Sequence, residues 1–104
     1  MQTTITARHC EVSDALRSRA VTVGERLGSQ ASRAMEMTVV FDAEGIRHIV
    51  ELRLHVGGGD ILVASAEGAD HRTALDRAEE KLRRQVERSS ERRRSRSKQP
   101  NNPL

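Results

Sequence analysis

Apolar residues recur at every second position on both sides of the turn-forming sequence DAEGI, residues 42–46. Such a period of two places side chains alternately on the two faces of an extended strand. Glycine and aspartate between two alternating segments favour a hairpin. The pattern predicts a β-hairpin with one apolar face. The apolar positions are Met35, Met37, Val39 and Phe41 before the turn, and Val50, Leu52, Leu54 and Val56 after it.

Two further segments have strand character. The sequence TTITAR, residues 3–8, is short and β-branched, and ILVASAEG, residues 61–68, follows a second turn signal, VGGGD. The latter segment has Leu62, Ala64 and Ala66 on one face. Its opposite face is also fairly apolar, with Ile61 and Val63, so the sequence leaves the facing of this strand open.

Two segments have helical periodicity instead. Ser13 is a predicted N-cap and Gly28 a predicted stop for the first helix, and the second helix begins near Asp70. Beyond Val86 no apolar residue continues the second stripe, so this helix is predicted to end near Ser89 or Ser90. The stripes are Leu16, Ala20, Val23 and Leu27, then Leu75, Ala78, Leu82 and Val86.

The predicted order β-α-β-β-β-α defines an α+β fold, a two-layer sandwich with two helices on one face of a four-stranded sheet. This layout is similar to that of double-stranded RNA-binding domains. A chain of 104 residues has room for one domain, here residues 1–90, followed by a disordered basic tail, residues 91–104. The sequence contains neither an apolar run long enough to span a membrane nor a signal peptide, so a cytoplasmic location is expected.

Charge divides the chain into two unlike parts. Residues 1–70 carry a net charge of −3 and residues 71–104 a net charge of +6, which together give the overall +3. Local positive charge favours a polyanionic partner, with nucleic acid the first expectation and an anionic membrane surface the second.

Four cations of the second helix, Arg77, Lys81, Arg84 and Arg88, follow one another at spacings of four, three and four. This spacing gathers them on one side of the helix, facing away from the predicted core. The alternative is a solvated helix face with intrahelical ion pairs, for example between Glu80 and Arg84. Ion pairing does not explain the following segment, where arginines outnumber acids.

Motifs for catalysis or metal binding are missing from the sequence. His48 and His55 have opposite parity on one predicted strand and should point to opposite faces. Cys10 is the only cysteine and is expected to be a small buried hydrophobe. The GGG at 57–59 lacks the residues of a phosphate-binding loop. We therefore expect no enzyme activity, no metal, no cofactor and no small-molecule substrate.

Five phrases of the sequence, in order, are TAR, VSDALR, RHIVELRLHVGGGD, ASAEGAD and ALDRAEEKLRRQVER. Together they resemble the short form of the ribosome hibernation promoting factor family, which includes ribosome-associated inhibitor A and is also labelled the sigma-54 modulation protein or S30EA family. The resemblance covers about residues 1–90. One departure stands out: the family commonly places Met-Tyr where this chain has His71 and Arg72, so the packing of that aromatic ring is expected to be lost.

The resemblance implies binding to the small ribosomal subunit and its 16S ribosomal RNA near the decoding region, where the protein would block messenger and transfer RNA. A monomer away from the ribosome and no membrane contact are expected. Two alternatives stay open: binding to another structured RNA, and regulation of a transcription sigma factor through the exposed sheet face. The candidate RNA-binding residues are Arg77, Lys81, Arg84 and Arg88, with Arg8 and Arg17 as weaker candidates.

Overall fold

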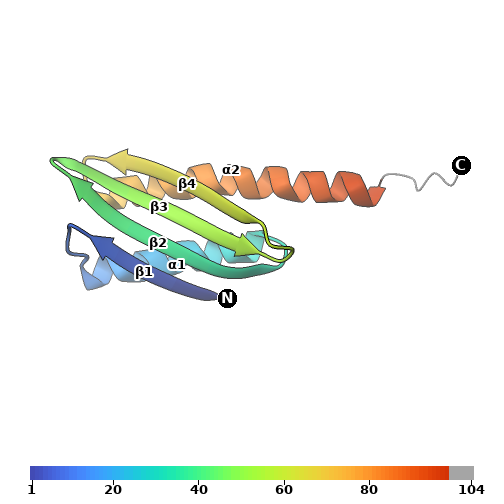
Figure 1. Ribbon diagram of the computed structural model, residues 1–104, viewed down its shortest axis with the longest axis horizontal. Helices are drawn as coiled ribbons and strands as arrows, with labels where there is room; N and C mark the ends of the chain where they lie inside the picture. Colours follow the sequence, from blue (N-terminus) through green and yellow to red (C-terminus); the bar gives the residue numbers. More distant parts are fainter. Residues whose placement is uncertain (99–104) are drawn as a thin grey trace, which may run out of the picture.

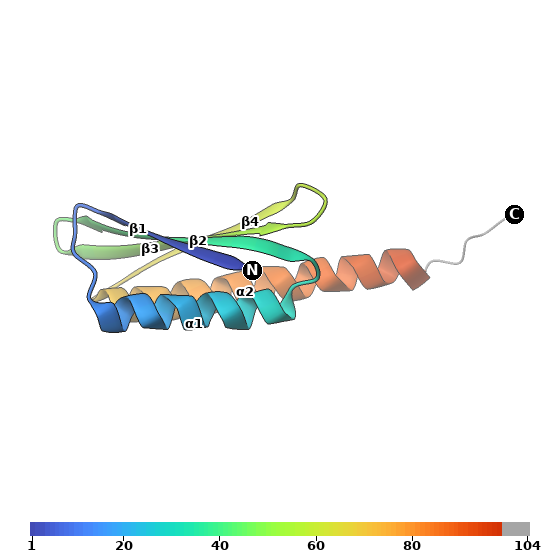
Figure 2. The same ribbon diagram turned by 90° about the horizontal axis from the view of Figure 1, so that it is seen from below.

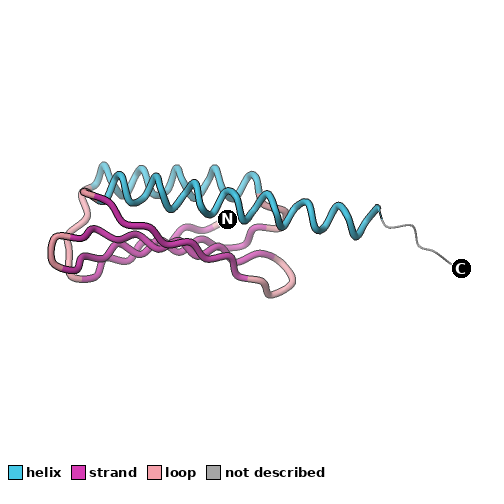
Figure 3. Tube along the Cα trace, turned by 90° about the horizontal axis from the view of Figure 1, so that it is seen from above, coloured by secondary structure: helices cyan, strands magenta, loops and turns pink. Residues whose placement is uncertain are grey.

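The computed structural model describes the backbone of residues 1–98 and the side chains of residues 1–89. Two helices cover one face of a four-stranded sheet (Figures 1 and 3). The strands lie in chain order, with β1 parallel to β2 and the other pairs antiparallel. This arrangement confirms the predicted fold class. The elements are β1 (Gln2–Arg8), α1 (Asp14–Gln30), β2 (Ala34–Glu44), β3 (Arg47–Val56), β4 (Ile61–Gly68) and α2 (His71–Lys98).

Helix α1 makes the crossover that the parallel pair β1–β2 requires. Its N-cap is confirmed, because the Ser13 Oγ accepts a hydrogen bond from the Leu16 backbone N–H at 3.1 Å. The predicted stop at Gly28 is wrong, since α1 continues to Gln30. Gly28 does not adopt the left-handed conformation with which glycine usually ends a helix.

The predicted hairpin between β2 and β3 is confirmed, and Gly45 in its turn has a φ of 60°. At the other end of β2, a register shift between Ala34 and Glu36 interrupts the pairing with β3. Met35 lies in this irregularity and is 63% exposed, so its predicted place on the core face is wrong. An irregular ladder turns the affected side chain away from the face that a regular alternation assigns to it.

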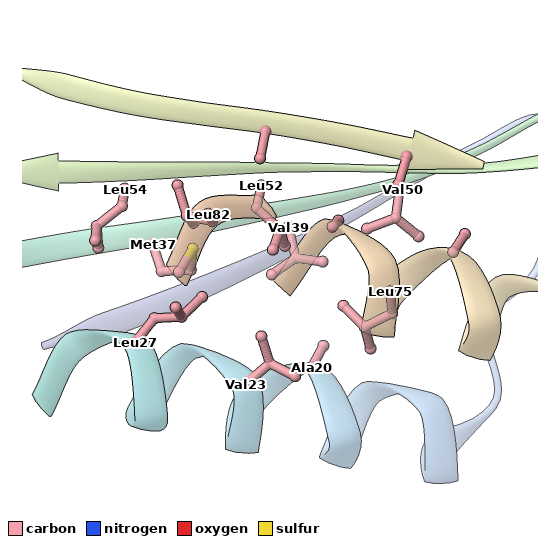
Figure 4. Close-up of a cluster of buried hydrophobic side chains, with 14 of the residues drawn as sticks. Ala20, Val23, Leu27, Met37, Val39, Val50, Leu52, Leu54, Leu75 and Leu82 are labelled. Atoms are coloured by element: carbon pink, nitrogen blue, oxygen red, sulfur yellow. The ribbon is translucent and has the colours of Figure 1, made fainter. Parts of the chain in front are cut away.

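The core lies between the sheet and the two helices, and Figure 4 shows its aliphatic side chains pointing toward one another from both layers. The open question about β4 is answered, because Ala64 and Ala66 are buried whereas Ile61 and Val63 are exposed. Each fully buried leucine contributes about 1.5–3 kcal/mol. The largest fully buried side chains are Phe41, Leu27, Met37, Leu52, Leu54, Leu75, Leu82, Val23, Val39 and Val50.

Helix α2 extends beyond the sheet (Figures 1 and 2). The predicted end near Ser89 or Ser90 is wrong, because α2 continues to Lys98. Residues 91–98, which were predicted to be disordered, are therefore helical. Arginine, which is frequent there, favours helix, and lengthening an existing helix costs far less than starting one. The rest of the predicted tail, residues 99–104, lies outside the described residues, and the domain division at residue 90 stays a prediction.

Candidate nucleic-acid interface

Arg77, Lys81, Arg84 and Arg88, here called the basic ridge, lie along the side of α2. All four side chains are exposed, in contrast to the buried apolar stripe of the same helix. The prediction that these cations face away from the core is confirmed. Their surroundings differ, however, and the differences decide how much of each charge is available to a partner.

The side of α2 next to the sheet edge is tied to β4 by a regular series of hydrogen bonds. The Arg77 Nη1 donates to the Glu67 carbonyl at 2.9 Å, and the Lys81 Nζ donates to the Ser65 carbonyl at 2.9 Å. The Gln85 Nε2 continues the series, donating to the Val63 carbonyl at 2.6 Å.

This series forms because the repeats of the helix and the strand match. Four residues of helix advance about 6 Å, and two residues of antiparallel strand advance about 6.8 Å. Every fourth residue of α2 therefore meets every second carbonyl of β4. Because a backbone carbonyl carries no net charge, Arg77 and Lys81 gain a fixed position without losing their positive charge to an anion.

Arg84 and Arg88 differ from these two cations. The Arg84 Nε lies 3.4 Å from the Glu80 Oε1, so the predicted intrahelical ion pair is present, although both side chains are well exposed. Arg88 has no hydrogen bond or ion pair with any side chain in residues 1–89. Exposed pairs of this type are weak, so the positive charge of Arg84 stays largely available, and within residues 1–89 no carboxylate compensates the charge of Arg88.

Arg83, one residue before Arg84, belongs to a different network. Its guanidinium bonds both Glu80 and Glu87 along the helix. The hydrogen bond from Arg83, followed by the charges of Arg83 and Arg84, lowers the pKa of Glu80. Two carboxylates therefore neutralise Arg83, which the sequence analysis did not include in the ridge.

The opposite side of α2 faces α1, and there the charges cancel. Arg19 of α1 donates to the Asp76 carboxylate at 2.8 Å, and Arg26 forms two bonds with Glu79, at 2.8 and 2.9 Å. The hydrogen bond and charge of Glu79 raise the pKa of Arg26. These bonds join the two helices, and they leave little net charge in the seam between them.

The outward face of the sheet also pairs its cations with carboxylates. Arg47 bonds Glu67 on β4, and Arg53 lies 3.3 Å from Glu51. A surface on which the charges are paired in this way offers little attraction to a polyanion.

The weaker candidates Arg8 and Arg17 lie apart from the ridge. Arg8 ends β1, the strand at the opposite edge of the sheet from β4, and it pairs in register with Asp42. Arg17 lies on α1, two residues before Arg19, which faces α2. Residues two apart on a helix point in very different directions. The structure thus brings together four of the six candidates.

His71 occupies the place where the family commonly has a methionine, and the structure gives its ring contacts that the sequence did not predict. Its Nε2–H donates to the Asp42 carbonyl at 2.8 Å. The ring meets Phe41 and His48 edge-on, with centroids 5.5 and 4.8 Å apart. An aromatic ring other than the expected tyrosine therefore packs at the start of α2.

His48 is on the helix side of the sheet, as its parity with Val50 predicted. Within the described part of the chain, no group of three or more histidine, cysteine or acidic side chains is arranged to hold a metal ion. The described helices also include none that is long and apolar enough to cross a bilayer.

Gln85 was missed by the sequence analysis, although its spacing of four from Lys81 was a usable signal. Because Gln85 is neutral, the pattern of cations along the helix did not include it. Its bond to β4 becomes visible only once the open edge of the sheet is known to lie beside α2.

Comparison with known proteins decides the family. The sequence profile described as "Sigma 54 modulation protein / S30EA ribosomal protein" matches residues 3–94. The chain belongs to this family. The family is not enzymatic, which agrees with the expectation that the protein is not an enzyme.

A curated relative agrees with this assignment, and two solved structures agree with the fold. The ribosome hibernation promoting factor of Salmonella typhimurium is 40% identical over 88 residues, which cover 85% of this chain and 92% of the relative. The N-terminal domain of Thermus thermophilus Protein Y superposes with a TM-score of 0.71 at 28% identity, covering 82% of this chain and 93% of that one. A ribosomal subunit interface protein from Coxiella burnetii has the same fold, with a TM-score of 0.73 at 20% identity, covering 86% and 98% of the two chains.

Proposed function

We propose that this protein is a ribosome hibernation factor that binds the small ribosomal subunit near the decoding region. Bound there, it would occupy space that messenger and transfer RNA require, and so block translation without making or breaking a bond. Family membership supports this proposal, as does the name of the Salmonella typhimurium relative. A role on the ribosome implies a cytoplasmic location, and we expect the protein to be a monomer when it is not bound.

The observation that carries the proposal is that three of the four cations of the basic ridge have no carboxylate partner among residues 1–89. Arg77 and Lys81 are held in place by neutral carbonyls, while Arg88 has no partner among residues 1–89. Cations that are ordered but not neutralised suit a phosphate backbone, which an arginine can grip through two parallel hydrogen bonds. We assign 16S ribosomal RNA contact to the ridge, with Arg8 and Arg17 as secondary contacts.

Co-sedimentation with purified ribosomal particles tests the proposal. The protein should travel with small subunits but not with large subunits, and it should leave them at high salt because phosphate binding releases counterions. Added to a cell-free extract, it should also stop translation. Failure to bind small subunits at low salt would contradict the proposal.

Two further binding measurements separate the alternatives. Binding to RNA polymerase in a stationary-phase lysate, with ribosomal fractions empty, would assign the protein to sigma-factor regulation. Equal affinity for small subunits and for an unrelated structured RNA would assign it to general RNA binding.

A further inference from the structure

Strand β4 is an edge strand of the sheet, because β3 is the only strand of the described residues that pairs with it. An exposed edge normally presents both carbonyl and N–H groups, and another strand can pair with it. Here, three carbonyls that point away from β3 already accept hydrogen bonds from Arg77, Lys81 and Gln85 of α2. The residues that supply these carbonyls are Val63, Ser65 and Glu67.

The N–H groups of the same three residues point in the same direction. In an antiparallel pair, the N–H and C=O of one residue lie on the same side of its strand. The edge of β4 therefore presents a row of donors about 6.8 Å apart, next to the cationic heads of Arg77 and Lys81. The carboxylate of Glu67 does not oppose an anion here, because it is bonded to Arg47 across the outward face of the sheet.

The chemistry of this edge selects its partner. A peptide strand binds an edge by exchanging donors and acceptors, and three successive acceptors of the β4 edge are already bonded to α2. A nucleic acid backbone presents phosphates, which carry only acceptors and negative charge. Its successive phosphates are separated by a distance comparable to two residues of extended strand.

We propose that the β4 edge and the basic ridge together form a phosphate-binding rail for a strand of RNA. The N–H groups of Val63, Ser65 and Glu67 donate to phosphate oxygens, and Arg77 and Lys81 supply the charge. This inference rests on the proposed function, because it specifies which surface of the protein meets ribosomal RNA and which groups make the contact. It adds neutral backbone donors, which no search for basic residues identifies.

Ser65→Pro removes one N–H of the rail and keeps the carbonyl that holds Lys81. Proline is accepted in an edge strand where the missing N–H would point outward. Ser65→Ala is the matched control, since it alters the side chain and keeps the N–H. Lys81→Gln removes a charge instead of a neutral donor.

Affinity is measured across a series of KCl concentrations for purified small subunits and for a single-stranded oligouridylate. Ser65→Pro should weaken both by about tenfold without changing the salt slope, because a neutral donor releases no counterion. Ser65→Ala should match the wild type. Lys81→Gln should weaken binding and also reduce the salt slope for the oligouridylate by about 0.7.

The outcomes distinguish the rail from the proposed function. Small-subunit binding by the wild type with equal affinities for Ser65→Pro and Ser65→Ala would overturn the rail and leave the function standing. Binding of the oligouridylate but not of small subunits would overturn the function, while the Ser65→Pro effect would still support the rail. A wild-type dimer that Ser65→Pro abolishes would assign the edge to a second copy of the chain and overturn the rail.

Hydrogen exchange on the wild type gives a result even if Ser65→Pro does not fold. Binding to small subunits should slow exchange at the amides of Val63, Ser65 and Glu67. Unchanged exchange at all three amides in the bound protein would overturn the rail.

Discussion

The cations that line the two sides of α2 are held in opposite ways. On the side facing α1, Arg19 and Arg26 meet the carboxylates of Asp76 and Glu79. On the side facing β4, Arg77 and Lys81 meet backbone carbonyls. Both arrangements fix the side chains, but only the second leaves their positive charge free to attract a partner. The availability of a charge therefore depends on what surrounds it and not only on how many cations a helix contains.

The largest expected effect comes from reversing charge on the exposed part of the ridge. Arg84→Glu with Arg88→Glu should weaken binding to small subunits roughly 100-fold or more, because attraction to several phosphates becomes repulsion. The unfolding midpoint should change little, since both side chains are exposed. Fluorescence titration and thermal melts measure the two quantities. A large loss of stability with binding retained would contradict the assigned faces.

Affinity for small subunits should rise when the carboxylate that pairs with Arg84 is neutralised. Glu80 contacts both Arg83 and Arg84, so Glu80→Gln releases positive charge beside the ridge. We expect binding to small subunits to strengthen by about two- to fivefold and to become more salt-sensitive. An unchanged affinity would mean that Arg84 does not contact the RNA.

A matched pair of single substitutions separates the two sides of α2 directly. Arg26→Gln should lower the free energy of unfolding by about 0.5–1 kcal/mol, because it breaks a partly exposed ion pair, and it should leave ribosome binding unchanged. Arg88→Gln should weaken ribosome binding and leave the free energy of unfolding unchanged. Urea titration and co-sedimentation of both variants check this, and equal effects of the two on binding would remove the distinction.

The smallest expected effect is a loss of thermal stability at low pH. The backbone and side-chain hydrogen bonds from Thr73 lower the pKa of Asp70, and the hydrogen bond from His9 does the same for Asp42. A lowered folded-state pKa contributes stability above the unfolded value, near 4, and this contribution is lost as the pH falls through the folded-state pKa.

The unfolding midpoint should therefore drop as the pH is lowered below about 4. Asp70→Asn, which can still cap α2, should flatten that drop, as measured by thermal melts at several pH values. A melting profile identical to that of the wild type would mean that Asp70 does not contribute.

Most of the fold could be predicted because its determinants are local. The period-two segments gave β2 and β3, and the apolar stripe from Leu75 to Val86 gave the buried side of α2. The errors arose where pattern and structure are governed by different forces. Met35 does not lie on the core face, because a register shift interrupts the strand pairing there. Helix α2 continues beyond Val86, because helix propagation does not require contact with the core.

The site was predictable only in part. Helical spacing was sufficient to gather Arg77, Lys81, Arg84 and Arg88 on one side, and the ion pair of Arg84 with Glu80 was foreseen. The carbonyl contacts of Arg77 and Lys81 were not, because they depend on which strand forms the sheet edge beside α2. Sequence periodicity assigns a side chain to a face but does not identify the neighbouring element that meets it.

The most direct test of the central claim is the salt dependence of binding to small subunits for two variants of equal net charge. Arg84→Gln with Arg88→Gln removes two ridge cations, and Arg47→Gln with Arg53→Gln removes two that are paired with acids on the outward sheet face. The account predicts that the first pair reduces the log–log slope by about 1.5 to 2, whereas the second leaves it unchanged. Equal slopes for the two variants would show that overall charge, and not the ridge, governs binding.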